Sequence, residues 1–159
     1  MKERYFTVDE ARALLPELRQ LITKANKDLD ERTARLQILN NRYLKAEKAL
    51  DESDTPDDED DISLSKFRQR RAQFELAISE LSKEQGEFVR NLENWVDKIS
   101  SHGVILRKMK EGLIDFPACQ GEFKYFLCWQ HDEADISHWH LDGDGFVGRK
   151  SLRLLCEYY

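Results

Sequence analysis

Residues 67–95 read FRQRRAQFELAISELSKEQGEFVRNLENW, and a large apolar side chain recurs at every seventh position of this stretch. The recurring side chains are Phe67, Phe74, Leu81, Phe88 and Trp95. A second series with the same spacing, offset by three or four positions, runs through Leu64, Arg71, Ile78, Gln85, Leu92 and Ile99. This spacing is typical of the a and d positions of a coiled-coil helix.

The first third of the chain repeats the pattern. One series consists of Ile22, Leu29, Leu36, Tyr43 and Leu50, and the other of Ala25, Arg32, Leu39 and Ala46. Between the two halves, residues 51–61 hold eight acids, one proline and no base, which we interpret as a solvated turn. The sequence therefore predicts an antiparallel hairpin of two long helices, near 8–50 and 62–101.

The start of the first helix carries its own signals. Thr7 and Glu10 have the spacing of a capping box, in which each side chain bonds to the backbone N–H of the other residue. Pro16 follows about two turns later and removes a backbone donor. We expect either a kink near residues 15–16 or a short helix over 8–14 that restarts at Pro16. At the other end of the hairpin, Gly103 predicts the stop of the second helix.

Residues 102–159 have a different composition, since they hold all four histidines and all three cysteines. Alternating and extended runs predict strands at 104–109, 113–116, 123–129 and 136–141, and a strand or helical turn at 152–155. The expected fold class is mainly α (α+β): a long antiparallel two-helix coiled-coil hairpin with a small C-terminal antiparallel β meander. The expected domains are 1–102, the hairpin, and 103–159, a β-rich module packed on its open end.

The predicted apolar stripe of the second helix is wider than one partner helix needs, because Leu76, Ala77, Val89 and Val96 flank it. We therefore predict a homodimer that forms a four-helix bundle by two-fold symmetry, with a further, unidentified protein partner as an alternative. Arg32, Arg71 and Gln85 interrupt the ladders, and polar residues at such positions usually fix register or partner choice.

Composition excludes several classes of protein. The chain has 159 residues and a formal charge of −6, and without the acidic run at 51–61 its charges nearly balance. With no dense basic stripe and no long apolar run, we expect neither a nucleic-acid partner nor a membrane span. The polar N-terminus and the odd number of cysteines, without a CxxC pair, are typical of a cytoplasmic protein.

Three blocks of residues resemble a known family. They are Arg4-Tyr5-Phe6-Thr7 with Glu10-Ala11 and Leu14-Leu15-Pro16, then 112–117, then 127–129 with Glu133, Ile136, Trp139-His140 and 145–149. Together they resemble the uncharacterised bacterial domain-of-unknown-function family 2203 over nearly the whole chain. The resemblance implies a helical hairpin with a small C-terminal module and no established activity. The sequence departs from the family at Gln130-His131-Asp132, where members typically carry a basic residue and a glycine.

Two groups of residues in the C-terminal segment could carry chemistry. His138 and His140, with His131 nearby, are candidate ligands for a divalent metal, although their spacing completes no known motif. A second set, His140, Arg149, Glu133 and Asp115, could bind an anion or a small ligand, or could form a structural salt-bridge network. We interpret Cys128, between Leu127 and Trp129, as a core residue.

No common cofactor or hydrolase motif occurs, so the cofactor stays unknown and no catalytic residue is assigned. The leading hypothesis is a dimeric interaction or scaffold module without catalysis. The alternative is a small-ligand, anion or metal-binding protein, or an enzyme, with its site in the C-terminal module.

Overall fold

The computed structural model describes residues 3–53 and 61–158, with side chains up to residue 155. Two long helices, α1 (Val8–Asp51) and α2 (Asp61–Ser100), precede an antiparallel sheet, as predicted. Of the predicted acidic turn at 51–61, residues 54–60 lie outside the described part. The chain divides into two compact units, residues 1–27 with 93–159 (unit 1) and residues 28–92 (unit 2), and both helices contribute to each unit.

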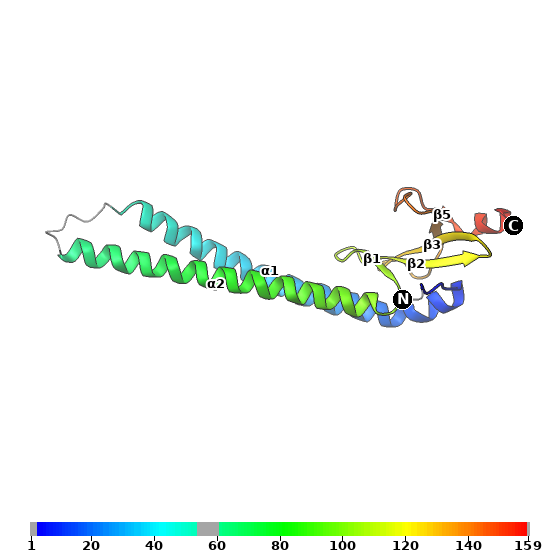
Figure 1. Ribbon diagram of the computed structural model, residues 1–159, viewed down its shortest axis with the longest axis horizontal. Helices are drawn as coiled ribbons and strands as arrows, with labels where there is room; N and C mark the ends of the chain where they lie inside the picture. Colours follow the sequence, from blue (N-terminus) through cyan, green and yellow to red (C-terminus); the bar gives the residue numbers. More distant parts are fainter. Residues whose placement is uncertain (1–2, 54–60, 159) are drawn as a thin grey trace. The chain divides into compact units, whose positions relative to one another are not determined.

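The helices of unit 2 run antiparallel and side by side (Figure 1). The rings of Tyr43 and Phe74, both predicted ladder residues, stack with their centroids 5.6 Å apart. The Arg70 guanidinium donates to the carbonyl of Ala49 over 3.4 Å. As the residue number falls along α1, that of its neighbour on α2 rises, which is the pairing of an antiparallel hairpin.

One predicted ladder of α2 differs from the structure. Ile78 is 39% exposed and Gln85 is also exposed, whereas their chain neighbours Ala77 and Glu84 are buried. Ile78 and Gln85 lie on one side of the central ladder of Phe74 and Leu81, and Ala77 and Glu84 lie on the other side. The flank of Ala77 and Glu84 is the closed one, since Ala77 is buried there and two arginines of α1, Arg32 and Arg35, pair with Glu84.

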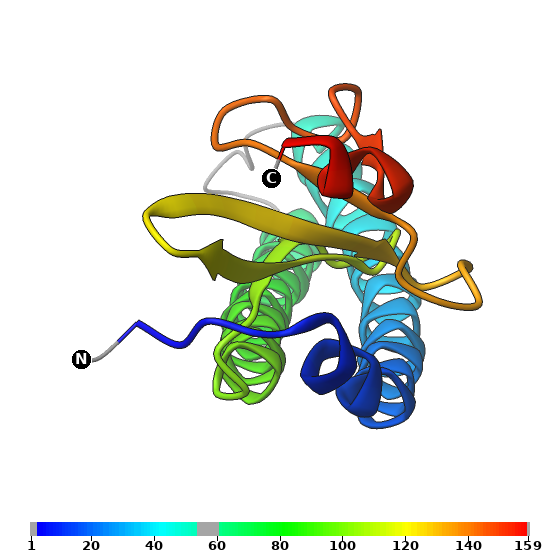
Figure 2. The ribbon, with the colours of Figure 1, turned by 90° about the vertical axis from the view of Figure 1, so that its right-hand side faces the viewer.

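Unit 1 contains a five-stranded antiparallel sheet in sequence order, followed by a 3-10 helix, η1 (Leu152–Tyr158). Its strands are β1 (Ile105–Lys108), β2 (Leu113–Gln120), β3 (Phe123–Gln130), β4 (His138–His140) and β5 (Lys150–Ser151). One sheet face buries Phe116, Leu127, Trp129 and Trp139 in the core, together with Ala11, Leu15, Leu18 and Ile22 of α1 and Ile99 of α2. Figure 2 shows the N-terminal segment running between the strands and the first turn of α1.

The start of α1 confirms the capping box and removes one of the two expectations for Pro16. Glu10 N donates to Thr7 Oγ1 over 3.2 Å, and Thr7 N donates to Glu10 Oε2 over 3.3 Å. Pro16 lies inside one continuous helix, so the predicted short helix over 8–14 with a restart is wrong. Burial of Leu15 and Leu18 on either side of the proline offsets the lost backbone hydrogen bond.

The strand bounds also differ from the prediction. β2 continues through Pro117 to Gln120. The backbone carbonyl of Pro117 points away from β3 and accepts from Phe6 N over 2.7 Å. Because the N and the carbonyl of a strand residue point to the same side, β3 does not need the N–H that proline lacks. β4 is only three residues long, and β5 was not predicted. Residues 152–155 form a helical turn, one of the two alternatives. No helix in the described part of the chain combines the length and apolar character needed to cross a bilayer.

Candidate functional site

The sheet face opposite the core carries a buried polar cluster. Asp115 on β2 pairs with Cys128 on β3, and Phe126 pairs with His140 on β4. Because side chains two residues apart share a strand face, Asp115, Cys128 and His140 all point to the same side of the sheet. Each is at most 3% exposed, and their potential metal-ligating atoms all lie within 4.8 Å of one another.

Asp115 and His140 form the centre of this cluster. Asp115 Oδ2 accepts a hydrogen bond from Arg107 Nε on β1 over 2.8 Å. Asp115 Oδ1 lies 3.0 Å from His140 Nε2, yet no donor is directed at this buried oxygen. The other ring nitrogen, Nδ1, lies 2.8 Å from the carbonyl oxygen of Leu141, and Phe126 stacks on the imidazole with centroids 5.4 Å apart. The ring is therefore held on two sides.

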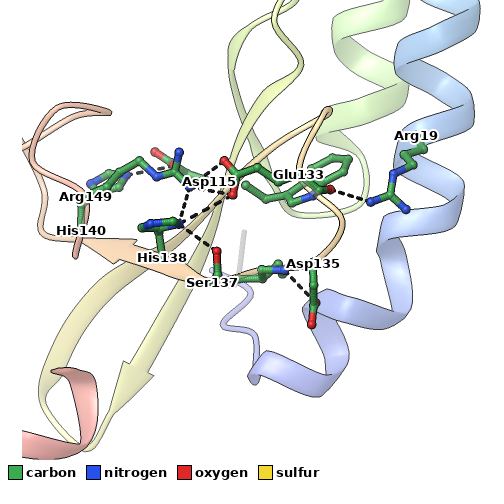
Figure 3. A network of polar contacts seen from close by, with 10 residues as sticks. Arg19, Asp115, Glu133, Asp135, Ser137, His138, His140 and Arg149 are labelled. Atoms are coloured by element: carbon green, nitrogen blue, oxygen red, sulfur yellow. Dashed lines mark hydrogen bonds and ion pairs between the residues drawn. The ribbon is translucent and has the colours of Figure 1, made fainter. Parts of the chain in front are cut away.

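Glu133, His138 and Arg149 form a second group of contacts (Figure 3). Arg149 Nη2 lies 2.6 and 2.8 Å from the two carboxylate oxygens of Glu133, and 2.7 Å from His138 Nδ1. Since a guanidinium only donates, Nδ1 of His138 must accept, and the ring proton sits on Nε2. Arg149 Nε is buried without a hydrogen-bond partner.

The loop that carries Glu133 is anchored from two directions. The Arg19 guanidinium on α1 donates to the carbonyl oxygens of Glu133 and Ala134 over 2.7 and 3.0 Å, as Figure 3 shows for Glu133. Trp129 Nε1 donates to the same Glu133 carbonyl over 3.0 Å. The helix and the core strand thus fix the position at which the Glu133 carboxylate meets Arg149.

Cys128 lies within the influence of both groups. Burial, and after it the negative charge of Asp115, raise the pKa of its thiol to about 12, and Arg149 acts in the opposite direction. At neutral pH the side chain is a thiol and not a nucleophilic thiolate. A buried thiol of this kind is no candidate for covalent catalysis, but its sulfur is available to a metal ion that displaces the proton.

The structure brings together most of the residues selected from sequence. Asp115 contacts His140, and Glu133 contacts Arg149 and His138. His131 is placed elsewhere, with Nε2 3.1 Å from Thr23 Oγ1 on α1. Among the described residues, the one group with three potential metal ligands is Asp115, Cys128 and His140, so it shares a single member with the set predicted from the histidines.

Cys128 is the member that sequence reasoning missed as a potential ligand. Its alternation with Leu127 and Trp129 already placed it on the face away from the core tryptophan. The pairing of Asp115 with Cys128, which brings the two side chains together, depends on the strand register.

A pocket of about 500 Å³ also opens in unit 1, and Asp115, Cys128 and His140 are not among its lining residues. Arg4, Lys124, Tyr125 and Pro117 are among its walls, together with Phe126. The pocket has apolar walls with a few charged groups at the chain's N-terminal segment, and the buried cluster offers the better defined chemistry.

Comparison with known proteins identifies the family. A family model described as an uncharacterized conserved protein (DUF2203) matches residues 4–152. The chain belongs to the DUF2203 family. The matched range contains every residue of the polar cluster, and the match confirms the family that the sequence blocks resembled. No curated protein and no solved structure matches the chain.

Proposed function

We propose that the protein is an interaction module that self-associates through unit 2, as a homodimer whose two hairpins form a four-helix bundle. The supporting observation is how little this hairpin buries on its own. Among the described residues of unit 2, only Leu29, Ala77 and Glu84 are buried, and one of these is charged. Isolated helices are marginal in water and depend on packing of an apolar face, so a second surface is needed to cover this one.

The two flanks of the hairpin differ in chemistry. On one flank, Glu84 receives Arg32 at 3.8 Å and Arg35 at 3.3 Å, and Arg42 lies 3.3 Å from Glu80. Arg32 and Glu84 each follow a central ladder residue by three positions. Their contact shows that such positions of both helices share one side of the hairpin, which is closed by charge pairs.

Positions four residues after the central ladder form the opposite flank. α1 places Thr33 and Asn40 there, and α2 places Ile78 and Gln85. Leu44 and Val89, each one residue after a ladder position, lie next to this flank and are 50% and 51% exposed. The middle of this flank is thus apolar with uncharged polar groups, while the corresponding positions nearer the acidic turn hold Glu47 and Arg71, and Asp30 and Glu75 lie along its edge.

A second copy of the chain is the partner that suits this flank. Both antiparallel helices contribute equivalent positions to this flank, so a two-fold axis can place each residue opposite the same residues of the second copy. Along the middle of this flank, uncharged amides and apolar side chains can meet their own copies without charge repulsion, whereas the other flank is occupied by paired arginines and glutamates. The proposed role is therefore to hold two C-terminal modules in one assembly.

Light scattering coupled to gel filtration tests the proposal on the full chain at micromolar concentration. The wild-type mass should be twice the 18.8 kDa of one chain. Replacing Ile78 and Val89 together by Glu should give the mass of one chain with helical content retained. Leu76→Glu is the matched control, because Leu76 is exposed but lines the groove beside Ala77 and Glu80 on the charged flank. A wild-type monomer, or equal loss of mass in the control, contradicts the proposal.

A second candidate function is the binding of a small ligand in the C-terminal sheet, favoured by the two buried polar atoms without partners, Asp115 Oδ1 and Arg149 Nε. Thermal shift with inorganic phosphate and, separately, with Zn²⁺ tests it. Wild type should be stabilised by one of the two probes, and His140→Ala or Arg149→Ala should fold but lose the response. If both variants unfold and neither probe stabilises wild type, the cluster is structural.

A further inference from the structure

We propose that Asp115, Cys128 and His140 form a binding site for one divalent transition-metal ion such as Zn²⁺. The inference deepens the second candidate function, a ligand site in the sheet, and names the ligand. It assigns the oxygen of Asp115, the sulfur of Cys128 and Nε2 of His140 as the three protein ligands.

The first argument is the placement of the three side chains. They come from three neighbouring strands and meet on one face, with their ligating atoms within 4.8 Å of one another. One oxygen, one sulfur and one imidazole nitrogen suit zinc and related ions better than calcium or magnesium, which prefer oxygen ligands. Because all three residues lie on paired strands, the backbone holds the positions of the ligands before an ion arrives.

The second argument is the hydrogen-bond accounting between His140 and Asp115. The carbonyl oxygen of Leu141 only accepts, so the proton of the neutral His140 ring sits on Nδ1. Nε2 then presents a lone pair to the carboxylate oxygen Oδ1 at 3.0 Å. Two acceptor atoms are thus close together, and the buried oxygen has no hydrogen-bond partner among the described residues. A positive charge between them, either a proton or a metal cation, would stabilise both atoms.

The third argument is the support around these ligands. A ligating histidine usually donates its other N–H to a carbonyl or carboxylate, and His140 Nδ1 does so at Leu141. A ligating carboxylate is usually hydrogen-bonded as well, and Arg107 Nε donates to Asp115 Oδ2 over 2.8 Å. This leaves Oδ1 and Nε2 as the atoms directed at the ion.

The local charge is compatible with a divalent ion despite two nearby arginines. Arg149 is neutralised by its contact with both oxygens of Glu133, and the Arg107 side chain is 41% exposed, so that solvent screens its charge. When the ion binds, the thiol proton of Cys128 leaves to solvent, and the thiolate adds a second negative charge beside the carboxylate. His131 and His138 are not needed for this set.

Metal titration of the chelator-treated full chain tests the site, with Co²⁺ as a spectroscopic probe and Zn²⁺ competed against a coloured chelator. Wild type should bind one ion per chain, and the Co²⁺ complex should show a thiolate charge-transfer band. Cys128→Ser should abolish that band and weaken Zn²⁺ binding by about tenfold or more. Circular dichroism checks that this nearly isosteric variant folds, and His140→Gln gives an independent loss.

Cys119→Ser and His131→Gln are the matched controls, because they remove the same chemical groups outside the cluster, and both should bind as wild type does. The inference is overturned if wild type binds no ion stoichiometrically, or if Cys128→Ser binds unchanged with the band intact. Stabilisation by phosphate without metal binding would support a ligand site in the sheet and refute the proposal that its ligand is a metal ion. Response to neither probe would refute both, and the proton would then be the charge shared by Asp115 and His140.

Discussion

Replacing Gly112 with alanine provides a sharp test of how unit 1 is packed. Gly112 lies just before β2 with a φ of +61°, in the left-handed region. A Cβ added there would lie 2.4 Å from the Cβ of His131 and 3.1 Å from Cγ2 of Ile22. Gly121, in the turn between β2 and β3, has the same φ of +61° but no atom within 4 Å of an added Cβ. The two glycines therefore differ in packing and not in backbone strain.

The expected magnitudes follow from this difference. A left-handed residue other than glycine costs about 1–2 kcal/mol, which applies to both variants. Overpacking of a filled site costs about 1–3 kcal/mol more, which applies to Gly112→Ala alone because the backbone anchors the Cβ atom of His131. We therefore expect Gly112→Ala to lose about 2–5 kcal/mol of unfolding free energy, and Gly121→Ala about 1–2 kcal/mol.

Urea unfolding followed by circular dichroism measures both values, and thermal melting gives a second estimate at about 2–4 °C per kcal/mol for a chain of this size. Equal destabilisation of the two variants would refute the packing described between Gly112 and His131. A smaller loss at Gly112 than at Gly121 would refute it as well, whatever the absolute size of the effects.

Three further predictions concern the cap, the thiols and the polar cluster. Thr7→Ala should cost about 1 kcal/mol in a urea titration, because it removes the acceptor for Glu10 N, and an unchanged midpoint would count against the cap. In a Cys156→Ser background, exposed Cys119 should react with a thiol reagent at pH 8 while buried Cys128 stays protected. Labelling of Cys128 should become faster as the pH rises toward its pKa of about 12. Equal labelling rates of the two thiols at pH 8 would contradict the burial of Cys128. Arg149→Ala should destabilise the protein by about 1–3 kcal/mol, because it strands Glu133, whereas Arg71→Ala at the exposed pair with Glu75 should cost about 0–1 kcal/mol; the reverse order would refute the network.

The helices were the part of the fold most readable from sequence. Their predicted ranges, 8–50 and 62–101, agree within one residue with Val8–Asp51 and Asp61–Ser100, because a heptad repeat and a capping box are local signals. The choice between Ile78 and Ala77 as seam residues was not local. Both satisfy the spacing, and the ion pairs of Glu84 with α1 show which flank the structure closes.

The sheet was predicted as a meander, but its strand bounds were less accurate. The run before Pro117 was expected to end there, because proline breaks a ladder in the middle of a sheet. β2 continues because β1 pairs only with residues up to Asp115, so the side of β2 at Pro117 is free to meet Phe6. Whether a strand can continue through a proline therefore depends on where its neighbouring strand ends, and the sequence of one strand does not contain that information.

The amino-acid sequence by itself determined the two long helices, the short strands after them and the set of polar residues from which a site could be built. Those features depend on periodicity, capping and side-chain chemistry, which act over a few residues. Only the tertiary structure decided that Cys128 joins Asp115 and His140 while His131 lies against Thr23. Strand register and the position of α1 set those contacts, and both result from the packing of segments that are far apart in the chain.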